Sequence, residues 1–187
     1  MGDPDAARRT LIAELRAHAL VIGDVTLSSG RQASYYVDAR RALLRPAGFL
    51  AAGELIAATA AELGAEAVGG PVMAAIPLAC AAIAVPAGGE LRGFFVRKER
   101  KEHGLQRWVE GPVEAGDRCL VVEDTVTTGG STVAAIERIR EQGLEIVGAL
   151  AVVDRLAGGA EAIESAAQAP FRALATIDDV YPERPEA

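Results

Sequence analysis

The fold is decided by one stretch of the chain, Leu120-Val121-Val122-Glu123-Asp124-Thr125-Val126-Thr127-Thr128-Gly129-Gly130-Ser131-Thr132. Its pattern predicts a buried strand from Arg118 to Glu123, then a polar turn, then a helix over 131–141. The glycines let the backbone approach a ligand closely, the hydroxyls can donate hydrogen bonds, and the helix start presents unpaired N–H groups. The stretch therefore predicts a phosphate-binding turn. It is not a Walker loop, because no Gly-Lys-Ser/Thr follows.

Two carboxylates, Glu123 and Asp124, end the predicted strand directly before this turn. At the mouth of an anion site they would repel phosphate unless they bind another part of the ligand. Ribose hydroxyls, or a Mg²⁺ ion chelated by the ligand, would suit both carboxylates. The simpler alternative is that the pair only solvates the end of a strand.

The chain's only lysines, Lys98 and Lys101, lie together in the segment Arg97-Lys98-Glu99-Arg100-Lys101-Glu102-His103-Gly104. Lysine is a compact, mobile point charge, which suits a phosphate that moves or leaves. A solvated charged loop is the simpler interpretation of such a run. Read together with the turn after residue 126, the segment instead predicts a second group of anion-binding residues.

Outward from this stretch, the pattern alternates between short apolar strands and helices. It predicts helices over 5–20, 46–63, 78–85 and 160–167, and strands over 25–30, 34–38, 67–70, 91–96, 145–154 and 171–177. This alternation is typical of an α/β fold, a central and mostly parallel sheet with helices on both faces. We expect a single domain over 1–187, with N-terminal hood elements over 1–45, an α/β core over 46–181 and a disordered tail over 182–187.

Composition limits the class of protein. The chain has 187 residues, half of them apolar, and a formal net charge of −7, which argues against a general binder of nucleic acid or of anionic membranes. Cys80 and Cys119 lie in apolar runs and are expected to be buried free thiols. No signal peptide is evident, and the longest apolar stretch is too short for a membrane span and broken by prolines. The sequence predicts a cytoplasmic protein.

At these motifs the chain resembles the type I phosphoribosyltransferases, and among them the orotate phosphoribosyltransferases. The turn resembles that family's signature for 5-phosphoribosyl-1-pyrophosphate (PRPP), and the basic segment resembles its mobile loop. Two further matches are the ribbon from Leu27 to Asp38 and the triplet Val153-Asp154-Arg155. The matches run from about residue 24 to residue 155. The resemblance implies transfer of the phosphoribosyl group of PRPP to orotate, a step of pyrimidine (UMP) synthesis.

The resemblance also implies roles for individual residues. The catalytic residues would be Lys101 and Asp124, and orotate would contact Thr127 and Arg155. PRPP would contact Arg97, Lys98, Lys101, His103, Glu123, Asp124, Thr125, Val126, Thr127, Thr128, Gly129, Gly130 and Ser131. The implied cofactor is Mg²⁺, with no dedicated metal ligand in the protein. The implied assembly is a homodimer with shared active sites, without a nucleic acid or membrane partner.

The chain departs from some relatives at two positions, where Ser28 and Ala74 stand in place of lysines. Arg31 could replace the first lysine, and no charged residue lies near the second. Two alternative functions share the PRPP turn: a purine-type phosphoribosyltransferase, and an RNA-binding regulator of a pyrimidine operon. Two site residues also have simpler interpretations, an ion pair of Arg155 with Asp154 and an exposed surface position for His103.

Overall fold

The structure is a computed structural model, and it describes residues 3–26, 32–99 and 108–184. The helices are α1 (Pro4–His18), α2 (Arg40–Leu43), α3 (Pro46–Leu63), α4 (Ala75–Ala84), α5 (Gly130–Glu141), α6 (Gly159–Ala167) and α7 (Ile177–Val180), with a 3-10 turn η1 (Pro86–Gly88). The strands are β1 (Leu20–Thr26), β2 (Gln32–Val37), β3 (Ala67–Pro71), β4 (Arg92–Val96), β5 (Val109–Glu110), β6 (Arg118–Val126), β7 (Glu145–Asp154) and β8 (Phe171–Thr176).

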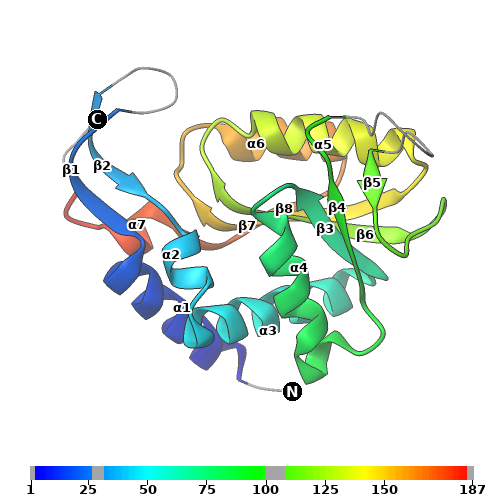
Figure 1. Cartoon of the computed structure of the whole chain (residues 1–187), viewed down its shortest axis with the longest axis horizontal. Coiled ribbons are helices and arrows are strands. Elements are labelled where there is room, and N and C mark those ends of the chain that lie inside the picture. Colours follow the sequence, from blue (N-terminus) through cyan, green and yellow to red (C-terminus); the bar gives the residue numbers. More distant parts are fainter. Residues whose placement is uncertain (1–2, 27–31, 100–107, 185–187) are drawn as a thin grey trace.

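Six strands form the central sheet in the order β5-β4-β3-β6-β7-β8. All neighbours are parallel except β5, which pairs antiparallel with β4. Helices α5 and α6 cover one face, and α1, α3 and α4 cover the other (Figure 1). The mostly parallel sheet with helices on both faces confirms the predicted fold class. Because both faces are covered, alternate residues of β6 enter two separate cores: Leu120 and Val122 on one side, Cys119 and Val121 on the other.

Local chemistry sets several boundaries, and those of α3 and β7 lie where the sequence placed them. Helix α3 starts with Pro46 at its first position and stops at Gly64, which adopts the left-handed conformation with φ 65°. Asp3 caps α1 by accepting a hydrogen bond from the Asp5 N–H at 3.0 Å. Strand β7 has the predicted bounds, Glu145–Asp154.

Other expectations need correction. Strand β6 continues three residues past Glu123, because Thr125 and Val126 pair with Val153 and Asp154 of β7. The last predicted strand ends at Thr176, where a capping box with Asp179 starts α7. Cys80 is exposed on α4, whereas Cys119 is buried as expected.

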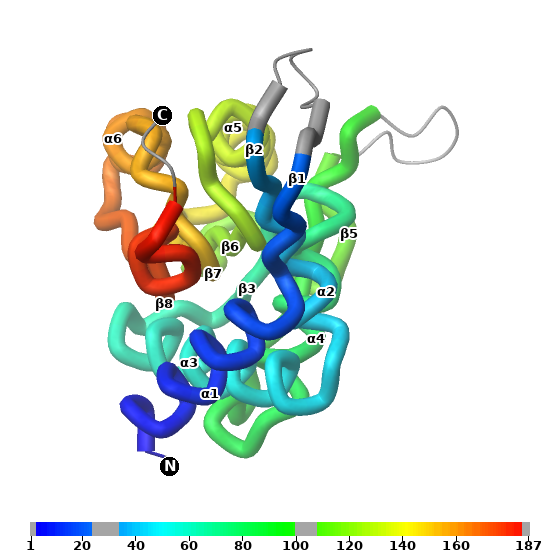
Figure 2. Tube along the Cα trace, turned by 90° about the vertical axis from the view of Figure 1, so that its left-hand side faces the viewer, coloured from blue at the N-terminus to red at the C-terminus, as the bar shows by residue number. Residues whose placement is uncertain are grey.

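The hood consists of α1, α2 and the antiparallel ribbon β1–β2. The ribbon stands at the end of the sheet where β6 and β7 finish, and α7 lies beside it (Figures 1 and 2). Leu11 and Leu15 of α1 are fully buried in the core cluster that also contains α3. The predicted tail is described only to Arg184, which pairs with Asp178; residues 185–187 lie outside the described part. In that described part, no helix is long and apolar enough to cross a membrane.

Candidate active site

The polar turn predicted from the sequence lies at the carboxyl end of β6, where it leads into α5. Thr127 and Thr128 are exposed, and so are Gly130 and Ser131 at the start of the helix. Gly129 is buried with φ 78°, and a Cβ there would meet the Gly159 carbonyl oxygen and Ile163 at 3.0 Å. A glycine is therefore needed to place the turn against α6 while leaving the hydroxyls on the outside. Ligands of open α/β sheets bind at this kind of edge, outside the carboxyl ends of the strands.

Glu123 points beneath the turn. Its side chain is 6% exposed, and its Oε2 accepts hydrogen bonds from Ser131 Oγ at 3.1 Å and Thr132 Oγ1 at 3.2 Å. Burial, followed by the charge of Asp124, raises the pKa of Glu123 to about 7, although the two hydroxyls oppose this rise. Glu123 thus ties the end of β6 to the first turn of α5.

Asp124 lies beside Glu123 and close to the hood: its N–H donates to Glu123 Oε1 at 3.3 Å, and its carboxylate also interacts with that of Glu123. It is partly buried, and its Oδ1 accepts the Thr125 N–H at 2.6 Å. Burial raises the pKa of Asp124, whereas the Thr125 N–H and the positive charge of Arg40 lower it. Arg40 belongs to α2 of the hood and pairs with Asp38 at 2.8 Å. The two carboxylates therefore interact with each other, while Glu123 also binds Ser131 and Thr132 of α5 and Asp124 also lies near the charges of Arg40 and Asp38.

Thr125 and Val126, which follow Asp124 in the chain, contribute little side-chain surface to the turn. Val126 is 2% exposed and packs in the core beneath α5, so only its backbone can face a ligand. The Thr125 hydroxyl oxygen is buried and has no hydrogen-bond partner within the described part of the chain. The predicted contacts of both residues with PRPP stay predictions.

Arg155 lies beside the turn, as predicted. Its N–H donates to the Val126 carbonyl at 2.9 Å, which places Arg155 next to Thr127. Its guanidinium carbon lies 5.4 Å from the centre of the Tyr35 ring, and the Asp154 carboxylate instead accepts the Leu156 N–H at 2.8 Å. The two residues predicted to contact orotate are therefore neighbours, and β2 of the hood reaches the same place.

Of the basic segment, the structure describes only Arg97, Lys98 and Glu99, and the description resumes at Trp108. The Arg97 N–H donates to the Trp108 carbonyl at 2.9 Å, and Arg97 Nη1 lies 3.7 Å from Glu110 Oε1. Lys98 is exposed, whereas Lys101 and His103 lie outside the described residues. Arg138 of α5 donates to the Arg97 carbonyl at 2.7 Å and stacks 4.0 Å from the centre of the Trp108 ring.

Sequence reasoning missed Arg138 and Arg40. Both are single arginines on helices, and nothing in their local pattern marks them. Only the packing of α5 against β4 brings Arg138 to the site, and only the packing of α2 against α1 and α3 brings the charge of Arg40 near Asp124. A cavity of about 470 Å³ lies elsewhere, lined by Glu66, Glu90 and Arg92 at the amino ends of β3 and β4. It is not part of this arrangement.

Known proteins share both the sequence and the geometry. Residues 43–168 match the phosphoribosyl transferase domain. The orotate phosphoribosyltransferase of Streptomyces avermitilis is 48% identical over 170 residues, 90% of this chain and 93% of that protein. The chain belongs to the orotate phosphoribosyltransferase family.

Solved structures of this family superimpose closely. The orotate phosphoribosyltransferase of Mycobacterium tuberculosis H37Rv in complex with Fe(III) dicitrate gives a TM-score of 0.85 at 42% identity, over 94% of this chain and 99% of that one. A structure of the M. tuberculosis enzyme in complex with PRPP gives 0.80 at 37% identity, over 93% and 98%. The match spans the hood as well as the core, since it covers nearly the whole of each chain.

Carboxylates near the turn are the side chains that could hold Mg²⁺ in this orotate phosphoribosyltransferase. Among the described residues, no three His, Cys, Asp or Glu side chains gather into a metal site. Mg²⁺ in proteins is commonly held by one or two carboxylates together with substrate phosphates. Asp124 fits that arrangement, because it is partly exposed beside the turn, whereas the Glu123 carboxylate is engaged with Ser131 and Thr132.

Proposed function

We propose that this orotate phosphoribosyltransferase joins its two substrates at the carboxyl ends of β6 and β7. PRPP would lie with its 5-phosphate on the turn from Thr127 to Ser131, and orotate beside Thr127 and Arg155. The observation that supports this proposal is the hydrogen bond from the Arg155 N–H to the Val126 carbonyl, 2.9 Å long. It places a guanidinium suited to a carboxylate next to a turn suited to a phosphate. The products would be orotidine 5-monophosphate and pyrophosphate.

The chemistry would be the attack of a ring nitrogen of orotate on C1 of PRPP. If the transition state has oxocarbenium character, positive charge grows on the ribose and negative charge on the departing pyrophosphate. Asp124 would face the ribose, and the basic segment would supply Arg97, Lys98, Lys101 and His103 for the pyrophosphate. Groups that bind more strongly in the transition state than in the ground state are those that raise the rate.

Glu123 and Asp124 would have different roles. Asp124 would contact the ribose hydroxyls and hold the Mg²⁺ chelated by PRPP, which when bound supplies positive charge to the pyrophosphate. Glu123 would hold the phosphate turn in shape through Ser131 and Thr132, rather than contact the ribose directly. The support for this division is that Glu123 is buried and accepts hydrogen bonds from α5, whereas Asp124 is partly exposed and lies near Arg40 of the hood.

We also propose that the chain forms a homodimer through α4. Ile76, Cys80 and Ile83 recur at helical spacing on the exposed side of this helix, and Met73, 76% exposed, lies just before its start. An apolar helix face of this kind is typical of an interface between subunits. A second copy of the chain is the occupant that we propose, because the same stripe on two subunits is self-complementary about a twofold axis. Shared sites would follow if residues of the basic segment reach the partner.

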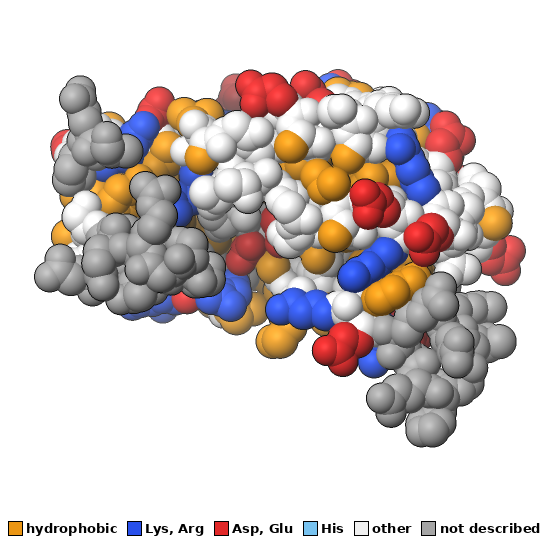
Figure 3. All heavy atoms as spheres, turned by 90° about the horizontal axis from the view of Figure 1, so that it is seen from above, with side chains coloured by type: hydrophobic (Ala, Val, Ile, Leu, Met, Phe, Trp, Pro, Cys, Tyr) orange, Lys and Arg blue, Asp and Glu red, His pale blue; other side chains and the backbone are white. Residues whose placement is uncertain are grey.

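Neither alternative function has a specific observation in its favour. The adenine phosphoribosyltransferase of Rhodothermus marinus shares the fold at 19% identity, which says nothing about the base. An RNA-binding regulator would need a continuous basic surface. On the face formed by α5 and α6, basic and acidic side chains are interspersed (Figure 3).

The activity is tested by incubating the protein with PRPP, Mg²⁺ and orotate and following the ultraviolet absorbance of orotate. Hypoxanthine, guanine and uracil serve as parallel substrates, and chelation of Mg²⁺ serves as a control. We expect orotate alone to be consumed, and only with Mg²⁺ present. Consumption of another base with orotate untouched would overturn the pyrimidine assignment while leaving the PRPP site in place.

A further inference from the structure

Three side chains from distant parts of the chain form a column beside the phosphate turn. Arg155 follows β7, Tyr35 lies in β2, and Tyr181 follows α7. The guanidinium carbon of Arg155 is 5.4 Å from the centre of the Tyr35 ring. The Tyr35 and Tyr181 rings have centroids 5.4 Å apart and planes at 82°, an edge-to-face contact. The column therefore connects the end of the chain to Arg155.

Each contact in the column restricts the next side chain. A guanidinium stacked on an aromatic ring uses its flat face, which leaves its N–H edge free to grip a carboxylate. Edge-to-face contact restrains the orientation of a ring, and such pairs contribute beyond the area they bury. Tyr181 thus restrains Tyr35, and Tyr35 restrains the direction of the Arg155 guanidinium.

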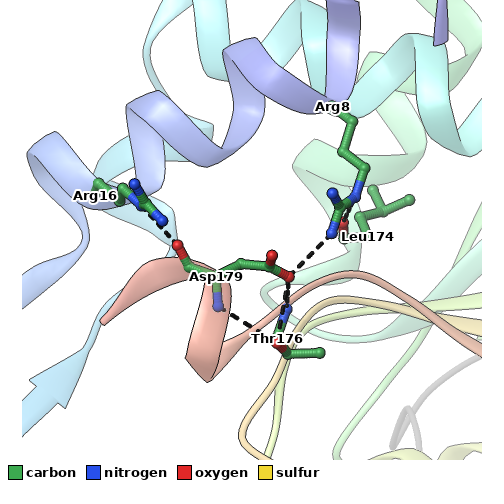
Figure 4. Close-up of polar contacts among 5 residues, drawn as sticks. All are labelled: Arg8, Arg16, Leu174, Thr176 and Asp179. Carbon is green, nitrogen blue, oxygen red and sulfur yellow. Dashed lines mark hydrogen bonds and ion pairs between the residues drawn. The ribbon is translucent and has the colours of Figure 1, made fainter. Parts of the chain in front are cut away.

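A polar network fixes Thr176 and Asp179 of the α7 region, just before Tyr181 (Figure 4). The Asp179 carboxylate accepts the Thr176 N–H at 2.9 Å and Arg8 Nη2 at 3.0 Å, and the Asp179 carbonyl accepts Arg16 Nε at 2.6 Å. Ile177 and Val180 are buried, so one side of the short helix is fixed by packing. The Tyr181 N–H closes the helix on the Ile177 carbonyl at 2.8 Å. A four-residue helix would not hold this position alone, since isolated short helices are unstable in water.

We propose that Tyr181 is a positioning residue for orotate, which acts through Tyr35 on Arg155. The inference rests on the proposed function, in which Arg155 contacts the orotate carboxylate. The ring of Tyr181 performs this role rather than its hydroxyl, because the contact with Tyr35 is between rings. The effect is confined to the orotate side of the site, since PRPP is held by the turn and the basic segment.

The test is the steady-state kinetics of Tyr181→Leu with Tyr181→Phe as the matched control. Loss of one edge-to-face pair predicts a rise in KM for orotate of about three- to tenfold, with KM for PRPP unchanged. Tyr181→Phe keeps the ring and should match wild type in both constants. Asp179→Asn, which weakens the anchor of α7 without touching either ring, should raise KM for orotate about twofold. An unchanged KM for orotate in Tyr181→Leu, an equal rise in both KM values, or a loss in Tyr181→Phe would overturn the inference.

The Arg155→Ala variant distinguishes failure of this inference from failure of the proposed function. If Arg155 grips orotate, its removal raises KM for orotate by more than Tyr181→Leu does, and the double variant shows no further rise, because both changes act through one guanidinium. An additive double variant would refute positioning by Tyr181 and leave the role of Arg155 intact. An Arg155→Ala variant with wild-type KM for orotate would refute the assignment of Arg155 in the proposed function.

Discussion

Replacement of Glu123 by glutamine should make the protein more stable at neutral and alkaline pH. Burial is the main reason that the pKa of Glu123 rises from its ordinary value of 4.5 to about 7. Glutamine has almost the same shape: its amide oxygen can still accept hydrogen bonds from Ser131 and Thr132, and only the long 3.3 Å bond from the Asp124 N–H to Oε1 is lost to the new NH2 group. The substitution therefore removes the cost of burying a charge and keeps the link between β6 and α5.

The size of the effect follows from linkage between protonation and folding. Between pH 4.5 and 7 the folded chain keeps the proton that the unfolded chain has lost, so wild-type stability falls as the pH rises through this range. A pKa difference of about 2.5, at about 1.4 kcal/mol for each pKa unit, corresponds to about 3.5 kcal/mol. The advantage of Glu123→Gln should thus be near zero at pH 4.5 and reach at most about 3.5 kcal/mol above pH 7. For a chain of this length, that free-energy difference corresponds to a rise in Tm of about 7–14 °C.

The assay is urea unfolding of both proteins at fixed concentration, at several pH values from 5 to 8. Glu137→Gln on the exposed side of α5 is the matched control, and its stability difference from wild type should not vary with pH. KM for PRPP should be nearly unchanged in Glu123→Gln, because the proposal assigns the ribose contact to Asp124. Parallel stability curves of wild type and Glu123→Gln across this range would refute the reasoning, since they would show no differential protonation.

Three further predictions concern the basic segment and the assembly. Lys101→Ala should lower kcat at least about a hundredfold with little change in Tm, because its assigned partner is the departing pyrophosphate; a fully active variant would contradict that role. Arg138→Ala should shift the fluorescence emission of Trp108, the chain's single tryptophan, to longer wavelength and make it easier to quench. Arg138→Lys should cause a smaller shift. Unchanged emission in Arg138→Ala would show that the stacked pair does not shield the ring. Ile83→Arg should turn a dimer into monomers in sedimentation experiments, whereas Glu90→Arg away from the stripe should not; a dimer that survives Ile83→Arg would place the interface elsewhere.

The sequence located the elements whose limits depend on local chemistry. Pro46 and Gly64 set the ends of α3 through a fixed φ and a left-handed C-terminal residue, which act within a few residues. The continuous apolar run of β7 predicted the bounds of that strand, because a strand buried on both faces tolerates few polar residues. The phosphate turn could also be predicted from the sequence, because its glycines and hydroxyl-bearing residues are adjacent in the chain.

Only the tertiary structure decided where the side chains around the phosphate turn point and which residues from other segments contact them. The continuation of β6 to Val126 depends on pairing with β7, and this pairing sends Glu123 toward α5 and Asp124 toward the hood. Arg138 at Trp108, and Tyr181 at Tyr35, come from segments at least 30 residues away in sequence. Local propensities carry no information about such distant contacts, because these arise only when burial of the helices and the sheet brings the segments together. The sequence by itself thus determined the kind of site, and the packing determined which residues hold it in position.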